Sequence, residues 1–295
     1  MTCRAALLAC VVLVAACGRT KPPASRKPSS SRSQSATPAA ANPWDEALGA
    51  VVATPSLDGA APVAFLRDSA GVADLDVELL NHDDRASRGT LHPRATDRTC
   101  AWRRAATLTT GDGHAVAANS WSLALAPGIA TPFGVDGIAE LTPRDSAALV
   151  ARISRLVSAI PEDSLSSQFH GLPVVVRDAW RLRLADSVTI TVAIAARSLN
   201  IESNPSAEST TLIAEPDSSA GAGELRTAYW ERESGPEDRV EGADLLAAFQ
   251  LRRGPAAMAL VRGGDGGPQV EIVERVSRGA WQLRWSTATL PCAQP

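Results

Sequence analysis

Strand-forming segments separated by turn residues fill the second half of the chain, and only one segment of the whole sequence has the apolar spacing of a helix. Residues 172–184 and 188–199 are rich in Val, Ile, Thr and Leu, and Ala185-Asp186-Ser187 between them is typical of a hairpin turn. The same composition predicts further strands at 211–214, 225–231, 256–261, 270–276 and 281–285, with a glycine-rich turn at 263–268, and weaker strands at 63–66, 75–80, 101–109 and 120–126. The sequence therefore predicts a mainly antiparallel β-sheet.

The one predicted helix covers residues 143–160. Thr142 is a suitable N-cap, Pro143 suits the first helical position, and Asp145 places an acid in the first turn. Behind them, apolar residues recur at helical spacing until Pro161 ends the run: Leu149, Ile153, Leu156, Val157 and Ile160. We expect an amphipathic helix packed on the sheet, so the predicted fold class is α+β, mainly antiparallel.

The N-terminus carries an apolar stretch from Ala5 to Ala16 behind Arg4. It is too short to span a bilayer, which takes roughly 20 residues, but it suits the core of a secretory signal. The residues 14–17, Val-Ala-Ala-Cys, resemble a bacterial lipobox. That resemblance implies a signal peptide over 1–16 and a lipidated Cys17. Because Gly18 follows where inner-membrane lipoproteins usually carry Asp, it also implies an outer-membrane lipoprotein facing the periplasm, bound to the membrane through its lipid.

Residues 17–42 are predicted to be a disordered tether, and residues 43–295 one compact β-rich body. From 19 to 42 the chain has no Val, Ile, Leu or aromatic residue and no acid. Such a segment cannot bury enough apolar surface to offset its ordering entropy. Its five positive charges could serve only for solubility or could attract anionic lipid head groups.

The distribution of charge excludes several classes of chemistry. The only lysines are Lys21 and Lys27, so the predicted body has no lysine for a phosphate-binding loop, a Schiff base or an S-x-x-K site. From residue 43 onward the chain holds 23 Arg against all 32 acidic residues. This net negative charge argues against a nucleic-acid partner.

Two cysteines remain after the predicted signal peptide and the lipidated residue are set aside: Cys100 and Cys292. In an oxidising periplasm such a pair is most simply a disulfide. The alternative is two buried free thiols.

Two histidine clusters are the candidate catalytic groups. His82, Asp83 and Asp84 follow a predicted strand, with His92 ten residues on, and could bind a metal or act as acid and base. Asp112 and His114 are separated by one glycine. Both clusters also have the composition of ordinary turns, as does His170-Gly171. Because no H-E-x-x-H, C-x-x-C, EF-hand or G-x-S-x-G pattern occurs, the sequence predicts no metal and no cofactor.

Acidic residues and tryptophans offer two further possibilities. Carboxylates cluster between Glu231 and Asp244, as glycosidases require, but interleaved arginines favour a solvated loop with local ion pairs. Seven tryptophans could form a sugar-stacking platform or could simply be core side chains: Trp44, Trp102, Trp121, Trp180, Trp230, Trp281 and Trp285.

Residues 244–276 loosely resemble a single FG-GAP (VCBS, integrin-α-type) β-propeller repeat, in which a strand leads through an acidic calcium loop into another strand. Here the loop is Arg252-Arg253-Gly254-Pro255 and has none of the acids that bind calcium. The resemblance implies strand architecture without the metal.

Taken together, these features predict a non-enzymatic lipoprotein that binds a ligand, or helps assembly, in the cell envelope, with an envelope protein or glycan as its partner. One alternative is a periplasmic hydrolase that uses the His/Asp groups. Another is a carbohydrate-binding module for envelope glycans.

Overall fold

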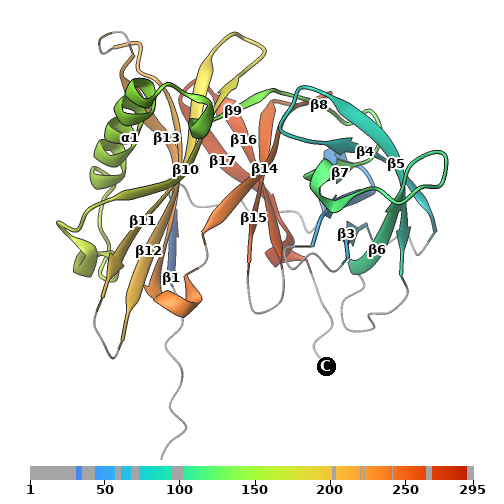
Figure 1. Ribbon diagram of the computed structural model, residues 1–295, viewed down its shortest axis with the longest axis horizontal. Helices are drawn as coiled ribbons and strands as arrows, with labels where there is room; N and C mark the ends of the chain where they lie inside the picture. Colours follow the sequence, from blue (N-terminus) through green and yellow to red (C-terminus); the bar gives the residue numbers. More distant parts are fainter. Residues whose placement is uncertain are drawn as a thin grey trace, which may run out of the picture.

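A computed structural model gives the structure of the protein, mostly antiparallel β with one α-helix, and confirms the predicted fold class. It describes residues 31–34, 44–56, 61–67, 73–94, 102–200, 204–219, 221, 223–240, 242–263 and 268–290. Its four layers follow one another across the molecule in Figure 1: the helix, a six-stranded sheet, a five-stranded sheet and a small closed barrel.

The six-stranded sheet carries the helix on one face. Its strands, in spatial order, are β1 (Ser31–Gln34), β13 (Leu225–Pro236), β12 (Ser206–Pro216), β11 (Thr189–Leu199), β10 (Val175–Arg183) and β9 (Val135–Gly137). Alternate residues point to opposite faces of a strand. Ala193 and Ala195 of β11 therefore pack under the helix, whereas Ile190 and Val192 pack against the five-stranded sheet.

Both faces of the five-stranded sheet are buried. Its order is β17 (Ala280–Ser286), β16 (Gln269–Ser277), β15 (Ala256–Arg262), β14 (Ala243–Leu251) and β8 (Ala130–Pro132). Every residue of β15 is buried: Met258 and Leu260 face the six-stranded sheet, while Ala259 and Val261 face the barrel. A strand covered on both sides needs no polar face, which explains its continuous apolar sequence.

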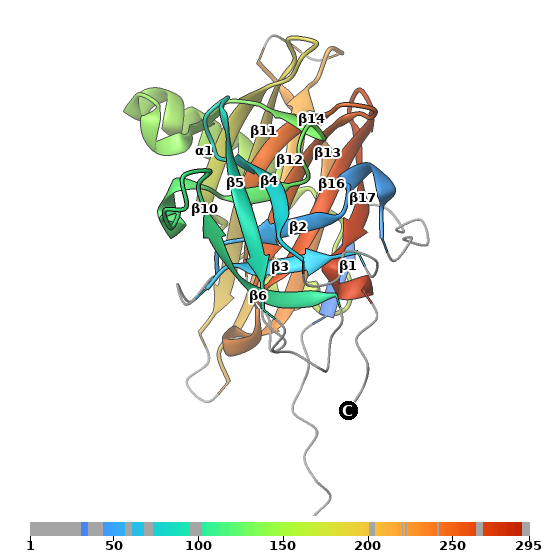
Figure 2. The ribbon, with the colours of Figure 1, turned by 90° about the vertical axis from the view of Figure 1, so that its right-hand side faces the viewer.

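The barrel closes in the order β2 (Val51–Thr54), β3 (Val63–Leu66), β6 (Arg103–Thr109), β5 (Ala86–Pro93), β4 (Leu75–Leu80) and β7 (Leu123–Leu125). It faces the viewer in Figure 2. Small and branched side chains such as Ala64, Val77 and Leu91 fill its interior, while Phe65 and Leu125 pack outward against the five-stranded sheet.

The helix α1 (Pro143–Ser158) forms where its capping residues predict it. The Thr142 hydroxyl accepts a hydrogen bond from the Asp145 amide, and Leu149, Ile153 and Val157 are buried on the sheet. Beyond its C-terminus, the Arg232 guanidinium donates to the carbonyls of Ile160 and Pro161, so these backbone groups are satisfied by a side chain of β13.

The strong strand predictions correspond to β10–β13 and β15–β17, and the hairpin at Ala185–Ser187 forms with Ser187 in the left-handed region at φ 65°. The structure adds β2, β5, β8 and β9, which we did not predict. It also places four residues of the predicted tether, Ser31–Gln34, in β1 against the edge of β13. Within the described part of the chain, no helix has the length and apolar character needed to cross a bilayer.

Candidate functional site

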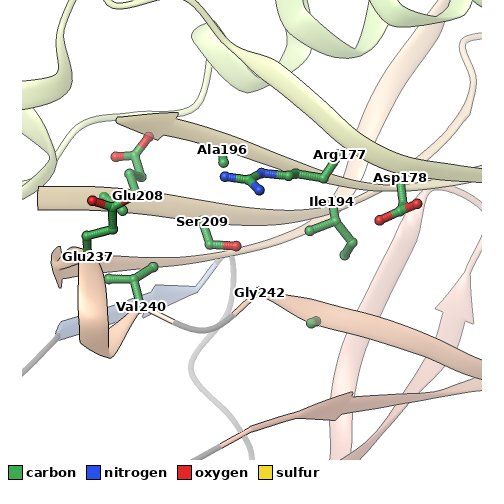
Figure 3. Close-up of a pocket in the computed structure, with 11 residues that line it drawn as sticks. Arg177, Asp178, Ile194, Ala196, Glu208, Ser209, Glu237, Val240 and Gly242 are labelled. Atoms are coloured by element: carbon green, nitrogen blue, oxygen red, sulfur yellow. The ribbon is translucent and has the colours of Figure 1, made fainter. Parts of the chain in front are cut away.

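A pocket of about 370 Å³ opens between the six-stranded and five-stranded sheets. Side chains from β10, β11 and β12 line one wall, and residues from the short helical turn η6 (Glu237–Arg239) to the start of β14 line the other (Figure 3). Its polar lining residues are Arg177, Asp178, Glu208, Ser209 and Glu237. A concave site with a few convergent polar groups is the usual form of a small-molecule site.

A β-bulge in β10 aims two neighbouring charged residues at this pocket. Val176 pairs with Ala195 and Asp178 pairs with Ile194, so Arg177 is an extra residue without a partner on β11. The insertion shifts the alternation of the strand. Val176 and Ala179 consequently pack on the helix side, whereas Arg177 and Asp178 both line the pocket. Without the bulge, two consecutive residues such as Arg177 and Asp178 would point to opposite faces of the strand.

Three charged groups of the lining are available to a ligand. In the part of the chain that the structure describes, Arg177, Asp178 and Glu237 are exposed and have no ion pair or side-chain hydrogen bond. Glu208 differs, because its carboxylate lies 3.3 Å from Arg197 Nη1 and 3.4 Å from Arg232 Nε within the buried layer. The pocket therefore offers one guanidinium, two carboxylates and the Ser209 hydroxyl.

Gly242 lies across the pocket from Ser209 and Ile194. A Cβ atom at Gly242 would lie 3.5 Å from Ser209 Oγ and 3.6 Å from Ile194 Cγ2, which is ordinary van der Waals distance. A Cβ atom at this position would thus fit beside the pocket lining without forcing the backbone to move.

The structure places His82 beside this region, but not with the acids that follow it. Its Nε2 lies 2.8 Å from the Leu245 carbonyl on β14. Because a carbonyl only accepts, Nε2 carries a proton in this contact. Asp83 closes the β4–β5 turn by accepting from the Arg85 amide, and Asp84 is exposed. The carboxylate in electrostatic contact with His82 is instead Asp244, which also interacts with Asp178 of the pocket.

Burial raises the pKa of Asp244, the His82 side chain opposes that rise, and the nearby Asp178 adds to it. The folded protein thus binds this proton more tightly than the unfolded chain does. The resulting stabilisation is complete below the ordinary pKa of 3.8 and is lost as pH rises through the folded-state pKa. We expect Asp244→Asn to match the wild type at pH 3 and to exceed its free energy of unfolding at pH 7, by less than about 1 kcal/mol at this partly exposed site.

Urea unfolding at the two pH values measures this difference. Asp186→Asn is the control, because it should change the free energy of unfolding in the opposite direction. A hydrogen bond from Arg275 lowers the pKa of Asp186. That variant should therefore be less stable than the wild type at pH 7, with the gap closing as pH falls through the folded-state pKa. An Asp244→Asn curve parallel to the wild type at all pH values would contradict the prediction.

The second predicted cluster forms an exposed hairpin turn after β6. The Thr110 amide donates to the His114 carbonyl, and Thr109 bridges to Ala115. His114 Nδ1 lies 3.2 Å from Asp112 Oδ2, and the side chains are 80% and 71% exposed. A hydrogen bond from the Thr110 hydroxyl lowers the pKa of Asp112. His170, another predicted connector, contacts Glu162 at 3.0 Å on the surface.

The solvated-loop interpretation of the acidic run is wrong for its first residues. Strand β13 continues to Pro236, and Glu231 and Arg232 are each only 1% exposed. Glu231 is stabilised there by Arg262 at 3.0 Å and by the Tyr229 hydroxyl at 3.1 Å, partners that come from β15 and from β13 itself.

The tryptophans mostly belong to the core. Trp44, Trp121, Trp281 and Trp285 are buried, and the other three are half-buried, so none of the seven is exposed. Trp44 stacks on Trp102 and meets Trp285 edge-on, which joins the barrel to the five-stranded sheet. A stacking platform for sugars would need exposed indole faces.

Several predicted features lie outside the described residues: the lipobox and Cys17, the cysteines Cys100 and Cys292, and most of the turn at 263–268. The segment resembling a propeller repeat forms β14, β15 and β16, adjacent strands of the five-stranded sheet. Among the described residues, no three His, Cys, Asp or Glu side chains are grouped to hold a metal ion.

Comparison of the chain with protein-family models, with curated proteins and with solved structures found no match.

The pocket residues Arg177, Asp178 and Ser209 are not among the site residues predicted from the sequence. One signal for the first two was present. Val174 and Val176 share the helix side with Ala179, so the apolar spacing slips by one position at the charged pair. Such a slip inside a strand indicates a bulge.

Proposed function

We propose that this protein is a cell-envelope lipoprotein that faces the periplasm and binds a small zwitterionic molecule between its two sheets. The observation that carries the proposal is the bulge that directs Arg177 and Asp178 into one pocket. A guanidinium pairs with a carboxylate in a two-pronged hydrogen-bonded geometry, and carboxylates pair with ammonium groups. A ligand that carries both groups, such as a free amino acid or the end of a short peptide, satisfies both sides of the lining.

The lipid anchor rests on the sequence between Val14 and Cys17. Two or more acyl chains hold a protein stably on a bilayer, because each buried methylene contributes about 0.8 kcal/mol. In this arrangement the protein presents its pocket at the membrane surface, where it serves as a binding or assembly-accessory component.

Thermal unfolding with three probe molecules tests the binding proposal. L-Alanine is the zwitterion, putrescine carries only ammonium groups and succinate carries only carboxylates. A ligand at 100 times its dissociation constant stabilises the folded state by about 2.7 kcal/mol. We expect stabilisation by L-alanine and a loss of that effect in Arg177→Met and in Asp178→Asn.

Two control variants make this test specific to the pocket. Gly242→Leu fills the pocket and should abolish the response to L-alanine. Its control is Gly221→Leu, which should keep the response, because a Cβ atom at Gly221 has no neighbour within 4 Å. Arg183→Met removes an exposed arginine from the same strand as Arg177 and should also keep it. The absence of stabilisation by L-alanine, or a response that survives in Gly242→Leu, would refute the proposal.

The lipid anchor is tested separately by fractionation of cells that express the protein. Cys17→Ser should move the protein from the membrane fraction to the soluble fraction.

A further inference from the structure

A polar row on the outer face of the barrel lies apart from the inter-sheet pocket. Leu91 of β5 and Leu108 of β6 point into the barrel, so their neighbours His92 and Thr109 point outward. His92 Nε2 lies 2.9 Å from Thr109 Oγ1, and His92 Nδ1 lies 2.8 Å from Asp74 Oδ1, just before β4. Strands β5 and β6 and the residue before β4 thus bring an imidazole, a hydroxyl and a carboxylate into one chain of hydrogen bonds.

The chemistry of the partners fixes the direction of these hydrogen bonds. An ionised carboxylate only accepts, so His92 Nδ1 carries the proton that it shares with Asp74. In the neutral imidazole, Nε2 then holds a lone pair and accepts from the Thr109 hydroxyl. A hydroxyl bonded to a base that is itself oriented by a third group is the general arrangement of an activated nucleophile.

The row is open to solvent and adjoins a second pocket. The His92 and Asp74 side chains are 34% and 66% exposed. Thr90, which pairs with Thr109 across β5 and β6, lines a cavity of about 330 Å³ together with Gly111, two residues beyond Thr109. Arg88 and Asp76 also line this cavity and give it one charge of each sign. This cavity, lined by the residue that pairs with Thr109, is large enough for a short acyl group.

We propose that Thr109 is the nucleophile of an acyl-transfer site in which His92 is the general base and Asp74 orients it, with small neutral carboxylic esters as the substrate class. Thr109 Oγ1 forms a bond to the ester's acyl carbon while its proton passes to His92 Nε2. The bond from the acyl carbon to the alcohol oxygen breaks, and His92 returns the proton to that oxygen. Water, deprotonated by His92, then attacks the threonyl ester, releases the carboxylic acid and restores the hydroxyl.

This assignment takes only His92 from the histidine clusters that the sequence offered, because its partners Thr109 and Asp74 do not adjoin a histidine in the sequence. It is also independent of the ligand proposed for the inter-sheet pocket. The two sites share no residue, so variants at one leave the other intact.

Labelling with a fluorophosphonate tests the proposal, because this reagent forms a stable ester with an activated hydroxyl and peptide mass spectrometry locates it. We expect the adduct on Thr109 in the purified protein. Removal of a general base costs on the order of 10²–10⁴ in rate, so His92→Gln should slow labelling at least about 100-fold. Asp74→Asn should slow it at least about 10-fold, because an amide no longer favours the required tautomer.

Four further variants complete the experiment. Thr109→Val should abolish the adduct, and Thr109→Ser should retain it, because the hydroxyl is preserved. Thr107→Val, which changes the residue paired with His92 on β6, and His114→Ala in the adjacent turn should label at the wild-type rate. Circular dichroism checks that each variant is folded. The absence of an adduct on Thr109, or equal rates in folded His92→Gln and wild type, would overturn the proposal.

Discussion

Replacing Glu215 with alanine is expected to lower the free energy of unfolding by about 3–5 kcal/mol, the cost of leaving a buried ion pair with one partner. Glu215 of β12 is fully buried and accepts four hydrogen bonds from the neighbouring sheet. Arg275 donates two of them, at 2.8 and 3.0 Å, and the Gly279 amide and the Trp281 indole donate the others, both at 2.8 Å. The substitution removes the acceptor of all four hydrogen bonds at once, and among the described residues Arg275 keeps only its contact with Asp186.

Urea unfolding measures this loss, and Glu224→Ala is its matched control. Glu224 pairs with Arg155 at 3.7 Å, and both side chains are more than half exposed. A surface pair of this kind contributes about 0–1 kcal/mol, so the control should unfold close to the wild type. In Glu215→Leu/Arg275→Met both charges of the pair are gone, and part of the stability should return. Equal effects of Glu215→Ala and Glu224→Ala would show that the carboxylate does not hold the sheets together.

Phe249→Ala is expected to lower the free energy of unfolding by about 3–5 kcal/mol through the loss of buried area and the cavity left behind. Phe249 is fully buried near the C-terminal end of β14, where it pairs with Pro132 of β8 and Ala257 of β15. Its side chain belongs to the core that joins the five-stranded sheet to the barrel. The cavity therefore weakens the contact between these two layers most directly.

Hydrogen exchange distinguishes this local effect from general destabilisation. Amides of β2 and β3 should lose more protection than those of β11 and β12, because the barrel strands share a core with Phe249 and the distant strands do not. Phe133→Ala is the control: this side chain is only partly buried at the edge of another core, so it should cost clearly less. A uniform loss of protection in Phe249→Ala would contradict the assignment.

The sequence predicted those helices and strands whose own residues show a clear apolar pattern. The helix follows from Thr142, Pro143 and the apolar spacing behind them, and β15 follows from an uninterrupted apolar run. Strand β5 carries no such signal. Of its eight residues only Gly89 and Leu91 are buried, because its outer face is exposed on the barrel. Strands of three residues, such as β8 and β9, are too short for any period to be visible.

The candidate sites depend on contacts that the sequence does not display. Glu231 and Arg232 belong to a charged run, and their buried ion-pair partners, Arg262 and Glu208, are distant in the sequence. Likewise, His92 and Thr109 are 17 residues apart, and their contact exists because β5 and β6 pair in one register. A shift of that register by one residue would turn one of the two side chains into the barrel. Residue types alone could therefore suggest histidine chemistry but could not name its partners.

Strand β1 would limit how far the protein can move from the membrane. A chain extends at most about 3.6 Å per residue, so the 26 residues between Cys17 and Trp44 would allow a span of roughly 95 Å. Pairing of Ser31–Gln34 with β13 leaves 13 residues between Cys17 and the sheet, and the limit falls to roughly 50 Å. For a chain held by lipid at Cys17, the β1–β13 edge would be the part of the folded body tied closest to the lipid, whereas the barrel lies on the other side of the molecule in Figure 1.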